Sequence, residues 1–160
     1  MSVVEDLSFR EIDYLIAVFS HSKGKGYTRQ LEILEELNVT KSTASLMIKK
    51  LVNKGYMRLD GRKIMLAEKG RTAVKEILWR HGVIESALTK LGLSSIQACE
   101  VTWKIAQKIP RNIVESIWRK LGRPDCCPCG YRFPHVNQEV DPENFEVCYT
   151  FKNASISKRP

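Results

Sequence analysis

The sequence predicts a mainly α-helical protein with one small β-hairpin and a cysteine-rich C-terminal segment. Apolar residues recur at helical spacing along most of the chain before Pro124, as expected for helices that each bury one face. One pair of short segments alternates apolar and polar residues around Asp60-Gly-Arg62, and Asp-Gly favours the positive backbone angles of a hairpin turn. After Pro124 the helical period stops, and four of the five cysteines lie in this last part.

The first three helices are placed by their apolar spacing and by the residues that cap them. We expect the first over residues 8–20 and the second over 28–36, with Thr28 as its N-cap and Leu31 on its inward face. The third is expected over 41–53, after a short turn. Two helices joined by such a turn are typical of a helix-turn-helix.

The hairpin follows directly on the third helix. Its strands are expected over 56–59 and 63–66, joined by the Asp-Gly turn. Three helices and a hairpin form the plan of a winged helix-turn-helix, in which the hairpin is the wing, and we expect this domain to occupy residues 1–72.

The rest of the chain is expected to form a helical domain over 73–124 and a cysteine-rich segment over 125–160. Two of its helices carry few charges on one face, which favours a role in dimerisation. The expected elements are helices over 68–91, 95–108 and 111–121, and a strand within 146–152.

The charge distribution indicates a nucleic-acid partner. The net charge is +8, and residues 41–63 hold seven Lys or Arg residues against one acid. A recognition helix places its first turns on base edges while flanking lysines neutralise phosphates. The residues predicted to contact double-stranded DNA are Thr28, Lys41, Ser42, Thr43, Ser45, Lys49, Lys50 and Arg62.

Several classes of protein are excluded by what the sequence lacks. There is no apolar run of the length that a membrane span needs, and the N-terminus does not resemble a signal peptide. We therefore expect a cytoplasmic protein without a membrane partner. The sequence contains no Gly-x-Ser-x-Gly, no glycine-rich phosphate loop and no evident Cys–His–acid set, so no enzymatic activity is expected.

The cysteines of the C-terminal segment indicate metal or redox chemistry. Cys126, Cys127 and Cys129 lie within four residues, Cys148 could return beside them on a strand, and His135 is a further candidate ligand. Four such ligands suit a zinc site or an iron–sulfur cluster. A thiol switch is a third possibility, because nearby arginines would lower the pKa of a thiol.

The order of motifs resembles the diphtheria-toxin-repressor family of iron- and manganese-responsive regulators, in its short two-domain type. The resemblance implies a homodimer that binds a palindromic operator, usually as a repressor, under the control of a divalent metal such as iron, manganese or zinc. It covers about residues 8–134 and depends on Arg80-His-Gly-Val-Ile-Glu85, Leu91-Gly-Leu93, Ile109-Pro110, Leu121-Gly-Arg-Pro124 and Cys127-Pro-Cys-Gly130.

The resemblance also implies metal ligands, residue by residue. His81 and Glu85 match two ligands of the family's ancillary site, and Cys99 takes the place of a histidine of that site. The family's primary site is expected to be lost. Asp13 matches one of its ligands, but the three positions on the fifth helix read Trp103, Ala106 and Gln107.

We therefore expect a DNA-binding regulator of metal homeostasis that uses the His81, Glu85 and Cys99 site, the terminal cysteines, or both. The alternative is a redox-sensing or constitutive DNA-binding regulator, in which the metal site is vestigial.

Overall fold

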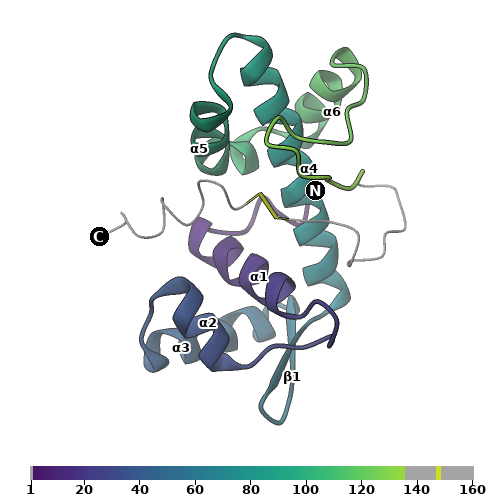
Figure 1. Cartoon of the computed structure of the whole chain (residues 1–160). Helices are drawn as coiled ribbons and strands as arrows, with labels where there is room; N and C mark the ends of the chain where they lie inside the picture. The colour runs from purple at the N-terminus through teal and green to yellow at the C-terminus, as the bar shows by residue number, and fades with distance from the viewer. Residues whose placement is uncertain (1, 136–146, 149–160) are drawn as a thin grey trace. The chain divides into compact units, whose positions relative to one another are not determined.

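A computed structural model describes residues 2–135 and 147–148 of the chain (Figure 1). Its residues divide into two compact units. The N-terminal unit is Asp6–Val74, and the C-terminal unit is Met1–Glu5 together with Lys75–Pro160. Within the described residues the chain is mainly helical with one two-stranded sheet, which confirms the predicted fold class.

Three helices form the first part of the N-terminal unit: α1 (Phe9–His21), α2 (Gln30–Leu37) and α3 (Lys41–Asn53). The Ser8 hydroxyl accepts from the Glu11 backbone N–H, and the Glu11 carboxylate accepts from the Ser8 N–H, which satisfies two donors that a helix start leaves open. The helices pack through an apolar core that includes the buried side chains Leu15, Ile16, Ile33, Ala44, Ile48 and Leu51.

The wing is an antiparallel hairpin of β1 (Met57–Asp60) and β2 (Lys63–Leu66). Gly61 lies at its tip with a positive φ of 56°, as the Asp-Gly pair predicted. Thr28 adds one antiparallel bridge to Ile64, so the chain before α2 is held against the wing.

The start of α2 differs from the prediction. Thr28 is fully buried and its hydroxyl donates to the Glu32 carboxylate at 2.5 Å, while Arg29 is the N-cap residue. The prediction that the Thr28 side chain caps this helix is therefore wrong, because its hydroxyl is used inside the unit. Its contact with DNA stays a prediction, to which a fully buried side chain gives no support. Leu31, predicted to face inward, is 63% exposed, and Ile33 is buried instead.

The C-terminal unit is built around α4 (Glu68–Lys90), which carries residues of both units. It is followed by α5 (Ser95–Ile105), a single 3₁₀ turn (Ala106–Lys108) and α6 (Arg111–Lys120). The prediction of one helix through residue 108 missed the 3₁₀ turn. Ile109 has an extended backbone, as the residue before a proline prefers, and the helix tightens and ends ahead of it.

A buried ion-pair network links α4 to the segment between α5 and α6. The Arg80 guanidinium donates to Glu76 Oε1 at 2.6 and 3.0 Å, and to the carbonyl oxygens of Gln107 at 3.2 Å and Ile109 at 2.6 Å. The Ser2 hydroxyl also donates to Glu76. The desolvation cost of burying the guanidinium is offset because its N–H groups donate to the Glu76 carboxylate and to two backbone carbonyl oxygens.

The helices of the described residues include none that is both long and apolar enough to cross a lipid bilayer. The predicted strand within 146–152 lies outside the described residues, apart from Val147 and Cys148, which are buried.

Glu11 gives the N-terminal unit a pH-dependent ion pair. Burial raises the pKa of its carboxyl, but hydrogen bonds from Lys54, the Ser8 backbone and Lys50 outweigh burial and lower the pKa from 4.5 to about 2. A lowered pKa stabilises the fold above pH 4.5, and this contribution, about 3 kcal/mol at most, is lost as the pH falls toward 2.

We expect Glu11→Gln to be less stable than the wild type at pH 7, with the difference shrinking between pH 4.5 and 2. Urea unfolding at several pH values measures this. Glu115→Gln is the control, since Glu115 forms a partly exposed pair with Arg119. A difference that does not change with pH would show that the Glu11 ion pairs contribute nothing.

Candidate metal centre and nucleic-acid interface

Two potential metal ligands project from one face of α4. His81 and Glu85 are four residues apart and both are buried, with His81 Nε2 3.0 Å from Glu85 Oε2. Spacing of i and i+4 places two side chains one above the other on a helix, as two ligands of one ion require. The indole of Trp103 stacks on the His81 ring with centroids 4.0 Å apart and so helps to fix its orientation.

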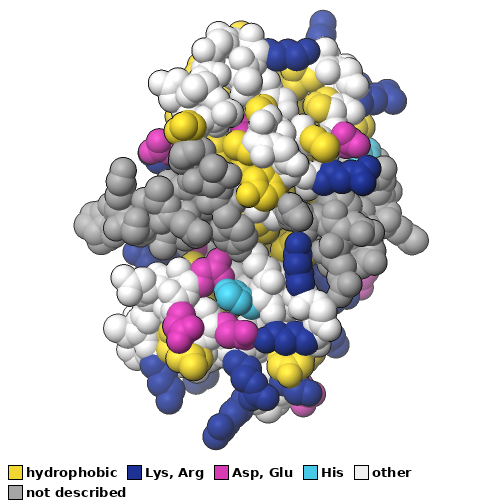
Figure 2. Space-filling model, viewed as in Figure 1, with side chains coloured by type: hydrophobic (Ala, Val, Ile, Leu, Met, Phe, Trp, Pro, Cys, Tyr) yellow, Lys and Arg dark blue, Asp and Glu magenta, His cyan; other side chains and the backbone are white. Residues whose placement is uncertain are grey.

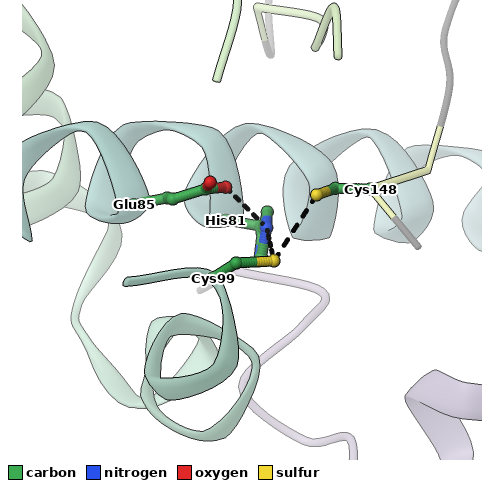
Figure 3. Close-up of side chains that lie close together, drawn as sticks. All are labelled: His81, Glu85, Cys99 and Cys148. Carbon is green, nitrogen blue, oxygen red and sulfur yellow. Dashed lines mark hydrogen bonds and ion pairs between the residues drawn. The ribbon is translucent and has the colours of Figure 1, made fainter. Parts of the chain in front are cut away.

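Cys99 from α5 and Cys148 from the C-terminal segment complete a four-residue group with His81 and Glu85 (Figure 3). Cys99 Sγ lies 3.8 Å from His81 Nε2 and 3.4 Å from Cys148 Sγ. One ligand atom from each of the four residues lies within 4.8 Å of the others, and all four residues are buried.

The donor atoms of this group are incompletely satisfied by the protein. His81 Nδ1 and Glu85 Oε2 are buried and have no hydrogen-bond partner among the described residues, although Glu85 Oε2 lies close to the imidazole. Burial lowers the pKa of His81, but hydrogen bonds with Cys148 and Glu85 outweigh it and the pKa is raised. A cation in this group would be bound through His81 Nε2 and Glu85 Oε2, and it would compensate the charge of the acidic neighbours.

A second group of ligands overlaps the first. It consists of Glu85, Cys127, Cys129 and Cys148, with one ligand atom from each again within 4.8 Å of the others. The Cys129 thiol donates to Glu85 Oε1 at 2.9 Å. A hydrogen bond to Cys148 and burial raise the pKa of Cys127, and burial and a hydrogen bond to Glu85 raise that of Cys129.

The Cys127-Pro-Cys-Gly130 sequence folds into a tight turn that directs these thiols. The Gly130 N–H donates to the Cys127 carbonyl at 2.8 Å, and the Cys127 N–H donates to the Tyr131 carbonyl at 2.9 Å. The chain that follows this turn packs closely on α4 at Gly82, because a Cβ at that position would lie 2.1 Å from the Phe133 ring. The turn is therefore held beside His81 and Glu85.

The structure joins two sites that the sequence suggested separately. Glu85 and Cys148 belong to both groups, a relation that the sequence alone did not indicate. Cys126 was predicted as a ligand, but it is exposed, pairs with Arg132 in a backbone bridge and belongs to neither group. The candidate ligand His135 instead stacks on Trp118, with ring centroids 4.3 Å apart.

The fifth-helix positions at which the resembled family has primary-site ligands are closely packed. Trp103, Ala106 and Gln107 line a hole of only about 10 Å³, which holds at most one water. Arg80 lines the same hole, with its charge paired to Glu76. The small volume, and a lining that among the described residues includes no carboxylate or thiol side chain, oppose a cation there.

The N-terminal unit has a basic groove between α2, α3 and the wing. It has a volume of about 570 Å³, and its lining includes four of the residues predicted to contact DNA, namely Lys41, Ser45, Lys49 and Arg62. Figure 2 shows Lys and Arg side chains, in dark blue, gathered on the surface over these elements. Ser42 and Thr43 are exposed on the first turn of α3.

Two of the predicted contact residues also have structural partners. The Gln30 amide donates to the Ser45 hydroxyl at 2.8 Å, which leaves the Ser45 hydroxyl hydrogen available as a donor. Lys50 Nζ lies 3.2 Å from the Glu11 carboxylate, and Lys50 does not line the groove. Arg29 and Gln30 also line the groove but were not among the predicted contacts, although their polarity at the start of the second helix was a usable signal.

Two family models match consecutive parts of the chain. The model of the iron dependent repressor N-terminal DNA binding domain matches residues 6–64. The model of the iron dependent repressor metal binding and dimerisation domain matches residues 67–135. Together they cover well over half of the chain.

The chain is also similar to individual transcriptional regulators and to a solved structure. An uncharacterized HTH-type transcriptional regulator of Aeropyrum pernix is 26% identical over 139 residues, which is 84% of this chain and 76% of that protein. The HTH-type transcriptional regulator MntR of Listeria welshimeri is 34% identical over 84 residues, 52% of this chain and only 59% of that protein. The crystal structure of a hypothetical protein from Sulfolobus solfataricus has a TM-score of 0.74 at 25% identity, and the match covers 81% of this chain and 100% of that one.

Proposed function

The chain belongs to the iron-dependent repressor family, and from this premise we propose that it is a metal-responsive transcription repressor whose ion binds at His81, Glu85, Cys99 and Cys148. The observation that carries the proposal is this buried set of four converging donors in the metal-binding domain. The proposed consequence is that the loaded protein binds its operator more tightly than the metal-free protein.

The distances between donors suit a tetrahedral ion. Metal bonds of about 2.3 Å to sulfur and about 2.0 to 2.1 Å to nitrogen imply edges of about 3.8 Å between two sulfurs and about 3.6 Å between sulfur and nitrogen. The corresponding distances here are 3.4 Å and 3.8 Å. Two thiolates and an imidazole favour Zn²⁺ or Fe²⁺ over Mn²⁺, which prefers oxygen ligands.

The groove residues are proposed to hold the DNA. α3 would lie in the major groove, with Ser42, Thr43 and Ser45 near base edges, while Lys49 and Arg62 contact phosphates. Leu46 is 72% exposed on the same helix and suits apolar contact with a thymine methyl group. In a two-fold dimer, two copies of α3 would read the halves of a palindromic operator.

The two neighbouring lysines of α3 are expected to contribute unequally. Lys49→Ala should weaken DNA binding and lower the slope of log affinity against log salt by about one, because one phosphate contact is lost. Lys50→Ala should change the slope less, since Glu11 compensates this charge. Fluorescence anisotropy over a range of salt concentrations measures both slopes, and a larger effect for Lys50 would contradict this assignment.

The dimer surface is proposed to include the outer face of α5. Ala98 and Cys99 of this helix are buried, whereas Ile96 and Ile105 are exposed. Exposed apolar side chains on a domain that matches a metal binding and dimerisation model are suited to packing against a second copy of the chain. Ile105→Glu is expected to shift the protein toward monomer in light-scattering measurements. Lys104→Glu on the same helix is the control, and loss of dimer in both variants would argue against a specific apolar contact.

Redox sensing is a second candidate, and one distance favours it. Cys99 Sγ and Cys148 Sγ are 3.4 Å apart, and a small movement would bring them to the length of a disulfide bond, about 2.05 Å. The two proposals differ in one measurable respect. Bound metal should protect both thiols from oxidation if the ion is the signal.

Selection of binding sites from a random duplex DNA library tests the main proposal. The full chain is loaded with Zn²⁺ in one selection and stripped with a chelator in the other. We expect an enriched palindromic sequence with the loaded protein and weaker enrichment without metal. Failure to enrich any sequence would contradict DNA-specific binding, and equal enrichment would contradict control by metal.

A further inference from the structure

We infer that the C-terminal unit binds two metal ions, the second at a thiolate-rich site of Glu85, Cys127, Cys129 and Cys148 that shares Glu85 and Cys148 with the first. The inference rests on the proposed function, because it takes an ion at His81 and Cys99 as given. The second ion is of the class that thiolates select, with Zn²⁺ as the probe.

The side chains that could donate to a metal here outnumber the four ligands of one tetrahedral ion, and they fall into two groups. Six side chains contribute, but they form two overlapping groups of four rather than one group of six. Within each group the ligand atoms lie within 4.8 Å of one another, about 1 Å beyond the edge of about 3.8 Å between two sulfurs of a tetrahedral zinc shell, so small side-chain movements would bring them onto one ion. Each group therefore outlines the shell of one ion.

The carboxylate of Glu85 faces both groups, one oxygen to each. Its Oε2 lies 3.0 Å from His81 Nε2, in the first group, and its Oε1 lies 2.9 Å from Cys129 Sγ, in the second. A carboxylate with its two oxygens divided in this way is placed to bridge two ions. Cys148 lies in both groups as well, so both ions would share its sulfur.

The charges of the cluster favour two ions over one. With a neutral imidazole, four thiolates and one carboxylate would carry five negative charges, all on buried residues except the half-buried Cys129. One divalent ion would leave three of them uncompensated, whereas two leave only one. Isolated buried charge is expensive, so a second ion would compensate the thiolates of Cys127 and Cys129.

The first test is the number of Zn²⁺ ions bound per chain. The full protein is purified anaerobically, loaded with excess Zn²⁺, desalted and measured by native mass spectrometry and elemental analysis. We expect two ions per chain. One ion per chain in the wild type would overturn the inference, and so would iron accompanied by inorganic sulfide, because the cysteines would then hold a cluster.

Variants assign each ion to its group. C127S/C129S should bind one ion per chain, and His81→Ala should also retain one, bound by the other group. Cys126→Ser, a neighbouring cysteine outside both groups, should still bind two. Circular dichroism shows whether each variant is folded. The number of Zn²⁺ ions bound by the wild-type chain tests the inference even if a variant does not fold. Loss of both ions from C127S/C129S with the fold intact would overturn the two-site arrangement.

The ion count is independent of DNA binding, so the two proposals fail in different ways. Two ions per chain with no effect of metal on DNA affinity would uphold the second site and contradict the proposed function. One ion per chain with a clear effect of metal on DNA affinity would do the reverse. Co²⁺ gives a further readout, since its sulfur-to-metal absorption should keep rising until two equivalents are bound.

Discussion

Replacing Arg80 by methionine is expected to lower the free energy of unfolding by about 3 to 5 kcal/mol. Methionine keeps much of the apolar stem but removes every donor of the guanidinium. Glu76, which is 1% exposed, would then be a buried carboxylate without its cationic partner. The carbonyl oxygens of Gln107 and Ile109 would also lose the donor that now satisfies them. Urea or thermal unfolding of the metal-free protein measures the loss.

The matched control for Arg80 lies on α6. Arg119 and Glu115 form a pair with the same i and i+4 spacing and the same 2.6 Å distance, but 59% of the Arg119 side chain is exposed. Arg119→Met is expected to cost less than about 1 kcal/mol, because water screens exposed pairs. The double variant Glu76→Gln/Arg80→Met should regain part of the loss. Equal costs for Arg80 and Arg119 would contradict the role given to burial.

Replacing His81 by alanine is expected to weaken metal binding at the first group by at least about 100-fold. The substitution removes one of four ligands, and loss even of groups that only support a ligand costs about 10- to 100-fold. The operator should then be bound with the same affinity whether or not metal is present. The groove of the N-terminal unit contains none of these ligands, so salt-dependent binding through phosphates should persist.

His135→Ala is the control for His81. His135 is also an imidazole of the C-terminal unit, but it stacks on Trp118 and belongs to neither ligand group. Its replacement should leave the affinity for Zn²⁺ unchanged. Isothermal titration in competition with a chelator of known affinity measures both variants. If His81→Ala retained the wild-type affinity, His81 would not be a ligand.

The fold class could be predicted from the sequence because its signals are local. Asp60-Gly61 fixes the hairpin turn, and the spacing of side chains such as Ala44, Ile48 and Leu51 defines the buried face of α3. The errors arose where a residue's role depends on distant partners. Thr28 has the chemistry of an N-cap, but its bridge to Ile64 buries it and directs its hydroxyl to Glu32.

The candidate metal centre could be predicted only in part, for the same reason. His81 and Glu85 lie on one helix, and their spacing alone places them together. Cys99 and Cys148 are 49 positions apart, so only the tertiary fold shows that their sulfurs are 3.4 Å apart. The exposure of Cys126 beside the buried Cys127 likewise follows from the geometry of the turn, which composition does not specify.

The most direct test of metal control is the affinity of the full chain for its selected operator, measured by fluorescence anisotropy with and without Zn²⁺. We predict tighter binding by the loaded protein, by about 5- to 150-fold, the usual range for coupling between two sites. By linkage, the operator should raise the affinity for Zn²⁺ by the same factor. Equal operator affinities for the loaded and the metal-free protein would contradict the account.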